Sequence, residues 1–167
     1  MKIMMTADTV GGVWNYALEV ARQLDHRGHT VVLATMGGMP SADQLAAANG
    51  IPNMQLYTSN YKLEWMAEPW ADVQAAGDWL MAIARATQPD VIHLNNYAHG
   101  TLPWPAPMVM VGHSCVLSWW QAVHGVPAPP AWRTYQHHVR AGLQSADVVV
   151  APTRAMLSTL QDHYGPF

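Results

Sequence analysis

The chain has 167 residues, of which half are hydrophobic and 11% are charged, and its formal net charge is −3 with neutral histidines. This length fits one domain with a sizeable core. Lys2 and Lys62 are the only lysines, so the sequence offers no basic stripe that would neutralise nucleic-acid phosphates. Cys115 is the single cysteine, which excludes an intramolecular disulfide and a zinc site built from cysteines.

The start of the chain does not look like a targeting segment. Met1 and Lys2 precede an apolar run too short for a signal peptide, and no apolar stretch is long enough to span a bilayer. We therefore predict a cytoplasmic protein. Because charged residues fall well below the usual quarter of a sequence, we expect part of the surface to meet a partner, either the inner face of a membrane, as a peripheral contact, or a second copy in a homodimer.

The first segment predicts a strand, a glycine loop and a helix in succession. An apolar run over residues 2–6 leads into a turn that contains Gly11 and Gly12, and an amphipathic stretch over residues 13–21 follows. Backbone N–H groups at the start of such a helix can meet an anion. Gly28 ends the helix, and the β-branched run over residues 30–35 predicts a second strand.

The rest of the chain continues the alternation of strands and helices. Capping-box spacing of Ser41 and Gln44 predicts a short helix, and apolar residues at helical spacing predict another from Trp70 to Thr87. Thr153 is predicted to cap a last helix that runs toward Tyr164. The other predicted elements are a weak strand over 55–58, strands that begin at 91 and 108, a helix over 131–145 and a strand over 148–151. This rhythm predicts one α/β domain over residues 1–167, a Rossmann-like three-layer αβα domain with a mainly parallel sheet.

Five segments of the chain resemble the N-terminal half of GT-B glycosyltransferases of family 4, the glycogen synthase-like group. They are the glycine loop after the first strand, "RGH" before the second strand, "PDVIH", "GHS" and "SADVVVAPT", in this order across nearly the whole sequence. The resemblance implies a retaining enzyme that transfers a sugar from a nucleotide-sugar to a hydroxyl acceptor, carbohydrate or lipid-linked, in carbohydrate biosynthesis. It implies no cofactor and no metal ion.

The resemblance also implies that half of the enzyme is not in this sequence. Enzymes of this family hold the nucleotide-sugar mainly through a C-terminal domain, which supplies a basic pair and a paired-glutamate motif. The three glutamates here do not stand in such a motif. We therefore expect the chain alone to be inactive in sugar transfer.

Candidate site residues lie where predicted strands end, because parallel sheets bind ligands at the carboxyl ends of their strands. His113 follows the strand that begins at 108, and the resemblance implies that it contacts the transferred sugar as a catalytic residue. Paired tryptophans offer flat faces for stacking on an acceptor. The predicted substrate-binding residues are Gly11, Gly12, Asn95, Asn96, His99, Ser114, Trp119 and Trp120.

Other functions remain open from the sequence. The two glycines also suit a tight turn without a ligand. The G-x-G-x-x-G spacing and an acidic residue at the end of the second strand are both absent, which disfavours a nicotinamide enzyme, and the histidines lack the spacing of a metal site. A different enzyme on the same sheet, a non-catalytic binding module and one chain of a split transferase are the alternatives.

Overall fold

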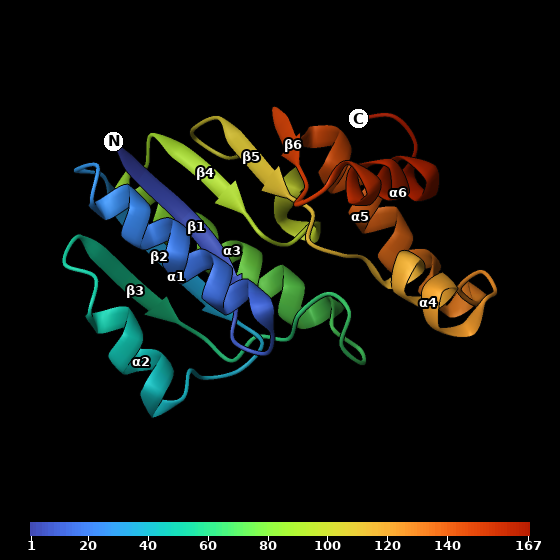
Figure 1. The fold of residues 1–167 in the computed structure, drawn as a ribbon, viewed down its shortest axis with the longest axis horizontal. Helices are drawn as coiled ribbons and strands as arrows, with labels where there is room; N and C mark the ends of the chain where they lie inside the picture. Colours follow the sequence, from blue (N-terminus) through green and yellow to red (C-terminus); the bar gives the residue numbers. More distant parts are fainter.

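A computed structural model describes residues 1–167, and it contains one six-stranded sheet in the order β3-β2-β1-β4-β5-β6 (Figure 1). Every pair of neighbouring strands is parallel. The strands are β1 (Lys2–Asp8), β2 (Thr30–Met36), β3 (Met54–Thr58), β4 (Val91–Leu94), β5 (Met108–Val111) and β6 (Val148–Val150). The predicted α/β class is confirmed, and the sheet is parallel throughout.

Helices connect the strands. They are α1 (Gly12–Asp25), α2 (Ala42–Asn49), α3 (Trp70–Thr87), α4 (Val116–His124), α5 (Arg133–Ser145) and α6 (Arg154–Tyr164), with short 3-10 helices η1 (Ala98–Thr101) and η2 (Pro130–Trp132). Helix α3 has the bounds that the apolar spacing predicts. Two predicted caps form: Ser41 accepts a hydrogen bond from the Gln44 backbone N–H, and Thr153 accepts one from that of Met156.

Helix α4 was not predicted. The segment has no Ser, Thr, Asp or Asn directly before it, so the usual signal for a helix start is missing. In the structure Cys115 takes this capping position, and its sulfur accepts a hydrogen bond from the Ser118 backbone N–H at 3.3 Å. Thiols are weak acceptors, so sequence rules for helix starts do not include them.

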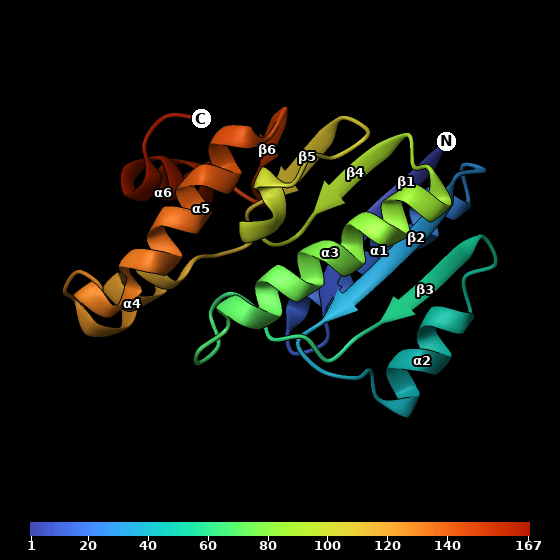
Figure 2. The same cartoon turned by 180° about the vertical axis from the view of Figure 1, so that it is seen from behind.

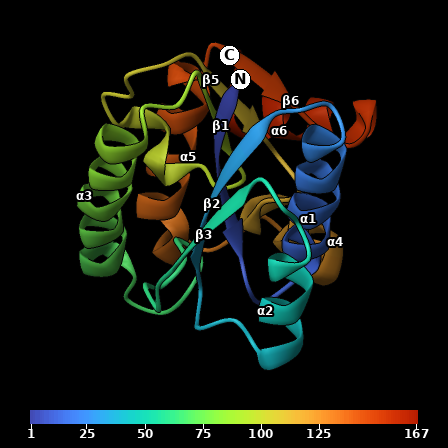
Figure 3. The same cartoon turned by 90° about the vertical axis from the view of Figure 1, so that its left-hand side faces the viewer.

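Two apolar layers lie on opposite faces of the sheet. Figures 2 and 3 show the helices that cover these faces. Helices α3 and α5 lie on one face, and α1 lies on the other. Side chains alternate between the layers along β1: Met4 packs on the α3 side and Met5 on the α1 side. On β6, Val148 and Val150 remain 50% and 43% exposed. The two faces of the sheet are therefore less completely covered at this edge than at its centre.

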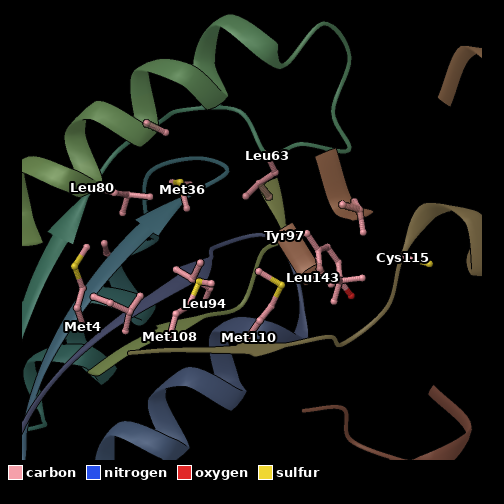
Figure 4. Packing of buried hydrophobic residues seen from close by; sticks show 14 of the residues in the cluster. Met4, Met36, Leu63, Leu80, Leu94, Tyr97, Met108, Met110, Cys115 and Leu143 are labelled. Atoms are coloured by element: carbon pink, nitrogen blue, oxygen red, sulfur yellow. The ribbon is translucent and has the colours of Figure 1, made fainter. Parts of the chain in front are cut away.

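Close packing joins the connection after β4 to helix α5. Tyr97 is buried in the larger layer together with Met110 and Leu143 (Figure 4). Gly142 lies against the backbone of Tyr97 so closely that an added Cβ would stand 2.0 Å from its carbonyl oxygen. Only glycine allows this approach, which fixes the path of the chain just beyond β4.

Candidate functional site

A cavity of about 450 Å³ opens at the carboxyl ends of β1, β4 and β5. After β1 the chain builds β2 and β3 on one side, and β4 then pairs with the other side of β1. Ligands of open parallel sheets bind at such a point of reversed strand order. We call the strand-end residues the polar floor: Thr6, Asp8, Asn95, Asn96 and His113. We call a second set of lining residues the apolar wall: Leu63, Trp65, Val116, Trp119 and Trp132.

Hydrogen bonds between β1 and the end of β4 hold the floor together. The backbone N–H of Asn95 donates to the Thr6 hydroxyl at 3.0 Å, and the Asn95 side-chain amide donates to the Thr6 carbonyl at 2.7 Å. The Thr6 hydroxyl in turn donates to the Asn96 side-chain oxygen at 2.9 Å. These three contacts fix both asparagines at the edge of the sheet.

His113 extends the floor to β5. Its Nε2 lies 2.8 Å from the Asn95 side-chain oxygen, which can only accept, so Nε2 carries a proton. Nδ1 has no partner within the chain. The ring of Tyr16 meets the imidazole edge-on at 4.6 Å between centroids.

Burial lowers the pKa of His113, while the nearby Asp8 carboxylate raises it by a smaller amount. The ring is therefore neutral near pH 7, with Nε2 bound to Asn95 and the lone pair of Nδ1 free. A neutral imidazole held in this tautomer can accept a hydrogen bond from a ligand hydroxyl.

His99 does not line the cavity. It is 4% exposed, and both ring nitrogens have partners: Nε2 donates to the Val73 carbonyl at 2.9 Å, and Nδ1 accepts from the Asn96 amide. Burial lowers the pKa of His99 as well. This histidine connects Val73 of α3 to Asn96 of the floor. We therefore do not include it among the ligand contacts proposed below.

The backbone of the glycine loop does not use the conformations that only glycine adopts. Gly11 has an extended backbone with φ −137°, and Gly12, the first residue of α1, also lacks a positive φ. Free rotation at φ is therefore not what these positions require. Gly11 lines a second, open hollow rather than the main cavity, and its N–H donates to the Asp8 carboxylate at 2.9 Å.

Asp8 is a floor residue that the sequence analysis did not select, although its place at the end of β1 was a usable signal. Its Oδ1 accepts the backbone N–H groups of Val10 and Gly11, at 3.0 and 2.9 Å. Its other oxygen has no partner in the chain. The carboxylate thus orders the turn before α1 and keeps one acceptor for a ligand.

Glu64 is a second lining residue that the sequence analysis did not select. Its carboxylate is buried and accepts the backbone N–H groups of Tyr97 and Ala98, at 3.0 and 2.6 Å. Burial raises the pKa of Glu64, and these hydrogen bonds lower it by less. Glu64 belongs to the loop that carries the wall residues Leu63 and Trp65, and its partners lie 33 and 34 residues later in the sequence. No local sequence pattern therefore predicts this contact.

Only one of the two predicted tryptophans of α4 lines the cavity. Trp119 lines the cavity and is 55% exposed, whereas Trp120 lies outside the lining and packs against His124 with ring centroids 4.5 Å apart. Ser114 lines the cavity and is exposed, and its carbonyl accepts the Tyr97 hydroxyl at 2.8 Å.

The lining contains neither lysine nor arginine. No group of three or more histidine, cysteine, aspartate or glutamate side chains is placed to hold a metal ion. None of the helices combines the length and the apolar character that crossing a membrane requires.

Solved structures with this architecture are GT-B glycosyltransferases. A glycosyltransferase from Rickettsia africae ESF-5 matches with a TM-score of 0.65 and 16% identity, over 98% of this chain and 39% of that chain. MurG from Acinetobacter baumannii matches with a TM-score of 0.61 and 14% identity, over 93% and 42%. LpCGTa in complex with UDP matches with a TM-score of 0.61 and 15% identity, over 97% and 49%. The chain spans less than half the length of these proteins, and at such identities the likeness shows the fold.

The sequence supplies the family. The model described as Glycosyltransferase Family 4 matches residues 10–166, which is nearly the whole chain. The chain therefore belongs to glycosyltransferase family 4, and its fold is the Rossmann-like α/β fold found in GT-B glycosyltransferases. Among curated protein sequences, none matches it significantly.

Proposed function

We propose that this domain forms the acceptor side of a retaining glycosyltransferase, which moves a sugar from a nucleotide-sugar to a hydroxyl acceptor. The observation that carries the proposal is the pair His113 and Asn95, which presents a free imidazole nitrogen into a cavity at the point of reversed strand order. Family membership and the UDP complex of LpCGTa support a nucleotide-sugar as the donor.

Each floor residue has a distinct part in the proposed reaction. Asn95 holds the His113 ring in one tautomer, so that Nδ1 can accept a hydrogen bond from a hydroxyl of the transferred sugar. The free Asp8 oxygen accepts from a second hydroxyl in the same cavity. Asn96 positions the floor and does not contact the ligand, because its amide oxygen and nitrogen already bond Thr6 and His99.

The leaving nucleoside diphosphate needs cations or N–H donors that this cavity does not supply. Stabilising the charge that develops on a leaving group is the largest single contribution in many enzymes. Because no lysine or arginine lines the cavity, we assign that contribution to a donor-binding half outside this sequence. The neighbours' greater length is in keeping with this division.

Replacement of His113 by alanine tests the proposal in the enzyme that carries both halves. We expect turnover to fall at least tenfold, about 1.4 kcal/mol of transition-state stabilisation, with little change in thermal stability. His26→Ala is the control, since His26 is exposed at the end of α1 remote from the carboxyl edge of the sheet. Equal turnover of the His113→Ala variant and the unaltered enzyme would remove this residue from the site.

The division into halves has its own test. We expect the isolated chain to fold and to transfer no sugar from a panel of nucleotide-sugars, whereas addition of the donor-binding half restores transfer. Transfer by the isolated chain at a rate near that of the two-half enzyme would overturn the division. Acceptor binding without transfer in either form would favour a binding module instead.

A further inference from the structure

Most polar atoms of the cavity are already engaged within the chain. Both amide atoms of Asn95 and both of Asn96 have protein partners. Both Glu64 oxygens accept backbone N–H groups. The floor therefore offers a ligand few free hydrogen-bonding groups, and the wall adds only the indole N–H donors of its tryptophans.

The free polar side-chain atoms on the floor side are few. The second Asp8 oxygen, His113 Nδ1 and the Ser114 hydroxyl have no partner in the chain. These three atoms can bind one ligand hydroxyl and the polar groups directly next to it. A carbohydrate chain carries hydroxyls along its whole length and needs acceptors as well as donors there, whereas the side chains of the wall include no acceptor.

The apolar wall supplies a second part of the cavity lining, beside the polar floor. Trp65 and Trp119 line it at 43% and 55% exposure, and Trp132 joins them from η2. Indole rings left this open lose water contact when a flat apolar molecule lies on them. Leu63 and Val116 complete a surface with no charged group.

Charge disfavours a phosphorylated ligand. The cavity holds two carboxyl groups, those of Asp8 and Glu64, and no lysine or arginine. A phosphate placed there would lose its hydration without gaining a cation. The lining therefore disfavours an anionic ligand.

On the basis of the function proposed above, we propose that the acceptor is an aromatic alcohol: a flat uncharged ring system that lies on the apolar wall, with its nucleophilic hydroxyl at the free oxygen of Asp8. The volume of about 450 Å³ falls in the range of about 300–1,000 Å³ that is typical of pockets for such molecules. This acceptor differs from the carbohydrate or lipid-linked acceptor that the family resemblance implies.

Calorimetric titration of the chain with three probes tests the proposal: 2-naphthol, maltose and octyl phosphate. We expect 2-naphthol to bind most tightly. Tighter binding of maltose would assign the cavity to carbohydrate, tighter binding of octyl phosphate would assign it to a phosphorylated lipid, and either result overturns the proposal. Failure of 2-naphthol to bind at millimolar concentration overturns it too.

Variants locate the binding site. Trp119→Ala and Trp65→Ala should each weaken 2-naphthol binding by about tenfold, as loss of an aromatic anchor does. Val123→Ala is the matched control, because Val123 lies on the same helix as Trp119, is 56% exposed and is not part of the lining. Unchanged affinity in both tryptophan variants would contradict the assignment to the wall.

The experiments distinguish a failure of the acceptor proposal from a failure of the transferase proposal. If the enzyme with both halves transfers sugar, and needs His113, while 2-naphthol neither binds nor accepts, the acceptor class is wrong and the transferase function stands. If 2-naphthol binds at the wall and no nucleotide-sugar supports transfer to any hydroxyl, the transferase function is wrong.

Discussion

The polar floor and the apolar wall line the same cavity but are built differently. Floor residues stand at the ends of neighbouring strands and are fixed by hydrogen bonds, such as those from Asn95 to Thr6. Wall residues come from a loop, from α4 and from η2, and Trp119 has more than half of its surface exposed. A rigid floor suits chemistry that is common to a family, whereas a wall on separate surface elements can change with the ligand.

The largest effect that separates the two regions should come from Gly142→Ala. An added Cβ would stand 2.0 Å from the Tyr97 carbonyl oxygen, which lies directly beyond the floor. We expect the free energy of unfolding to fall by about 3 kcal/mol or more, as in severe overpacking, although glycine to alanine within a helix normally stabilises. Urea unfolding measures it. A stable variant would show that the floor does not depend on this contact.

Acid should lower the stability of the sheet beneath the floor, because the half-buried His93 lies on β4, two residues before the floor residue Asn95. Burial lowers the pKa of His93 to about 4, from an ordinary value of 6.5. The folded state therefore keeps His93 neutral while the unfolded state takes up a proton near pH 6.5. The stability contributed by His93 is complete above pH 6.5 and is lost as the pH falls toward 4.

The pH effect is measured by urea unfolding at pH 4.5 and 7 for the unaltered chain and for His93→Gln. The variant should lose less stability on acidification, by up to about 3 kcal/mol. Glu64, whose pKa burial raises, acts in the opposite direction in both proteins, so the comparison isolates His93. Parallel pH profiles would contradict the assignment.

The smallest effect on stability is expected at the glycine loop, which borders the floor. No atom lies within 4 Å of a Cβ added at Gly12, and its φ is not positive. Gly12→Ala should change stability by no more than about 1 kcal/mol, measured by thermal unfolding. Unfolding of this variant would show that the loop requires glycine at this position.

The same division explains what the sequence could predict. Strand ends follow from the apolar runs, so Asn95, Asn96 and His113 were placed together at one edge of the sheet. The wall depends on α4, whose cap is Cys115, and on packing between distant segments. Glu64 joins such segments, and a buried carboxylate that accepts backbone N–H groups leaves no periodic trace in the sequence.

Burial separated residues that the sequence could not distinguish. Asn96 and His99 follow the same strand, yet only Asn96 reaches the cavity, because the chain turns into η1 between them. Trp119 and Trp120 are neighbours on α4, and successive helical residues point about 100° apart, so one enters the lining and the other does not. Local pattern places an element, but the orientation of a side chain depends on what packs against it.

The place of β1 at the centre of the sheet has a consequence for synthesis. Ile3 pairs with Val31 on one side and with Val91 on the other. Because chains emerge from the ribosome N-terminus first, β1, β2 and β3 can associate while the second edge of β1 still waits for β4. That open edge is a place where two nascent chains can pair wrongly. Contacts from Thr6 to Asn95 form only when β4 arrives, so ligand binding reports completed folding, whereas helix content does not.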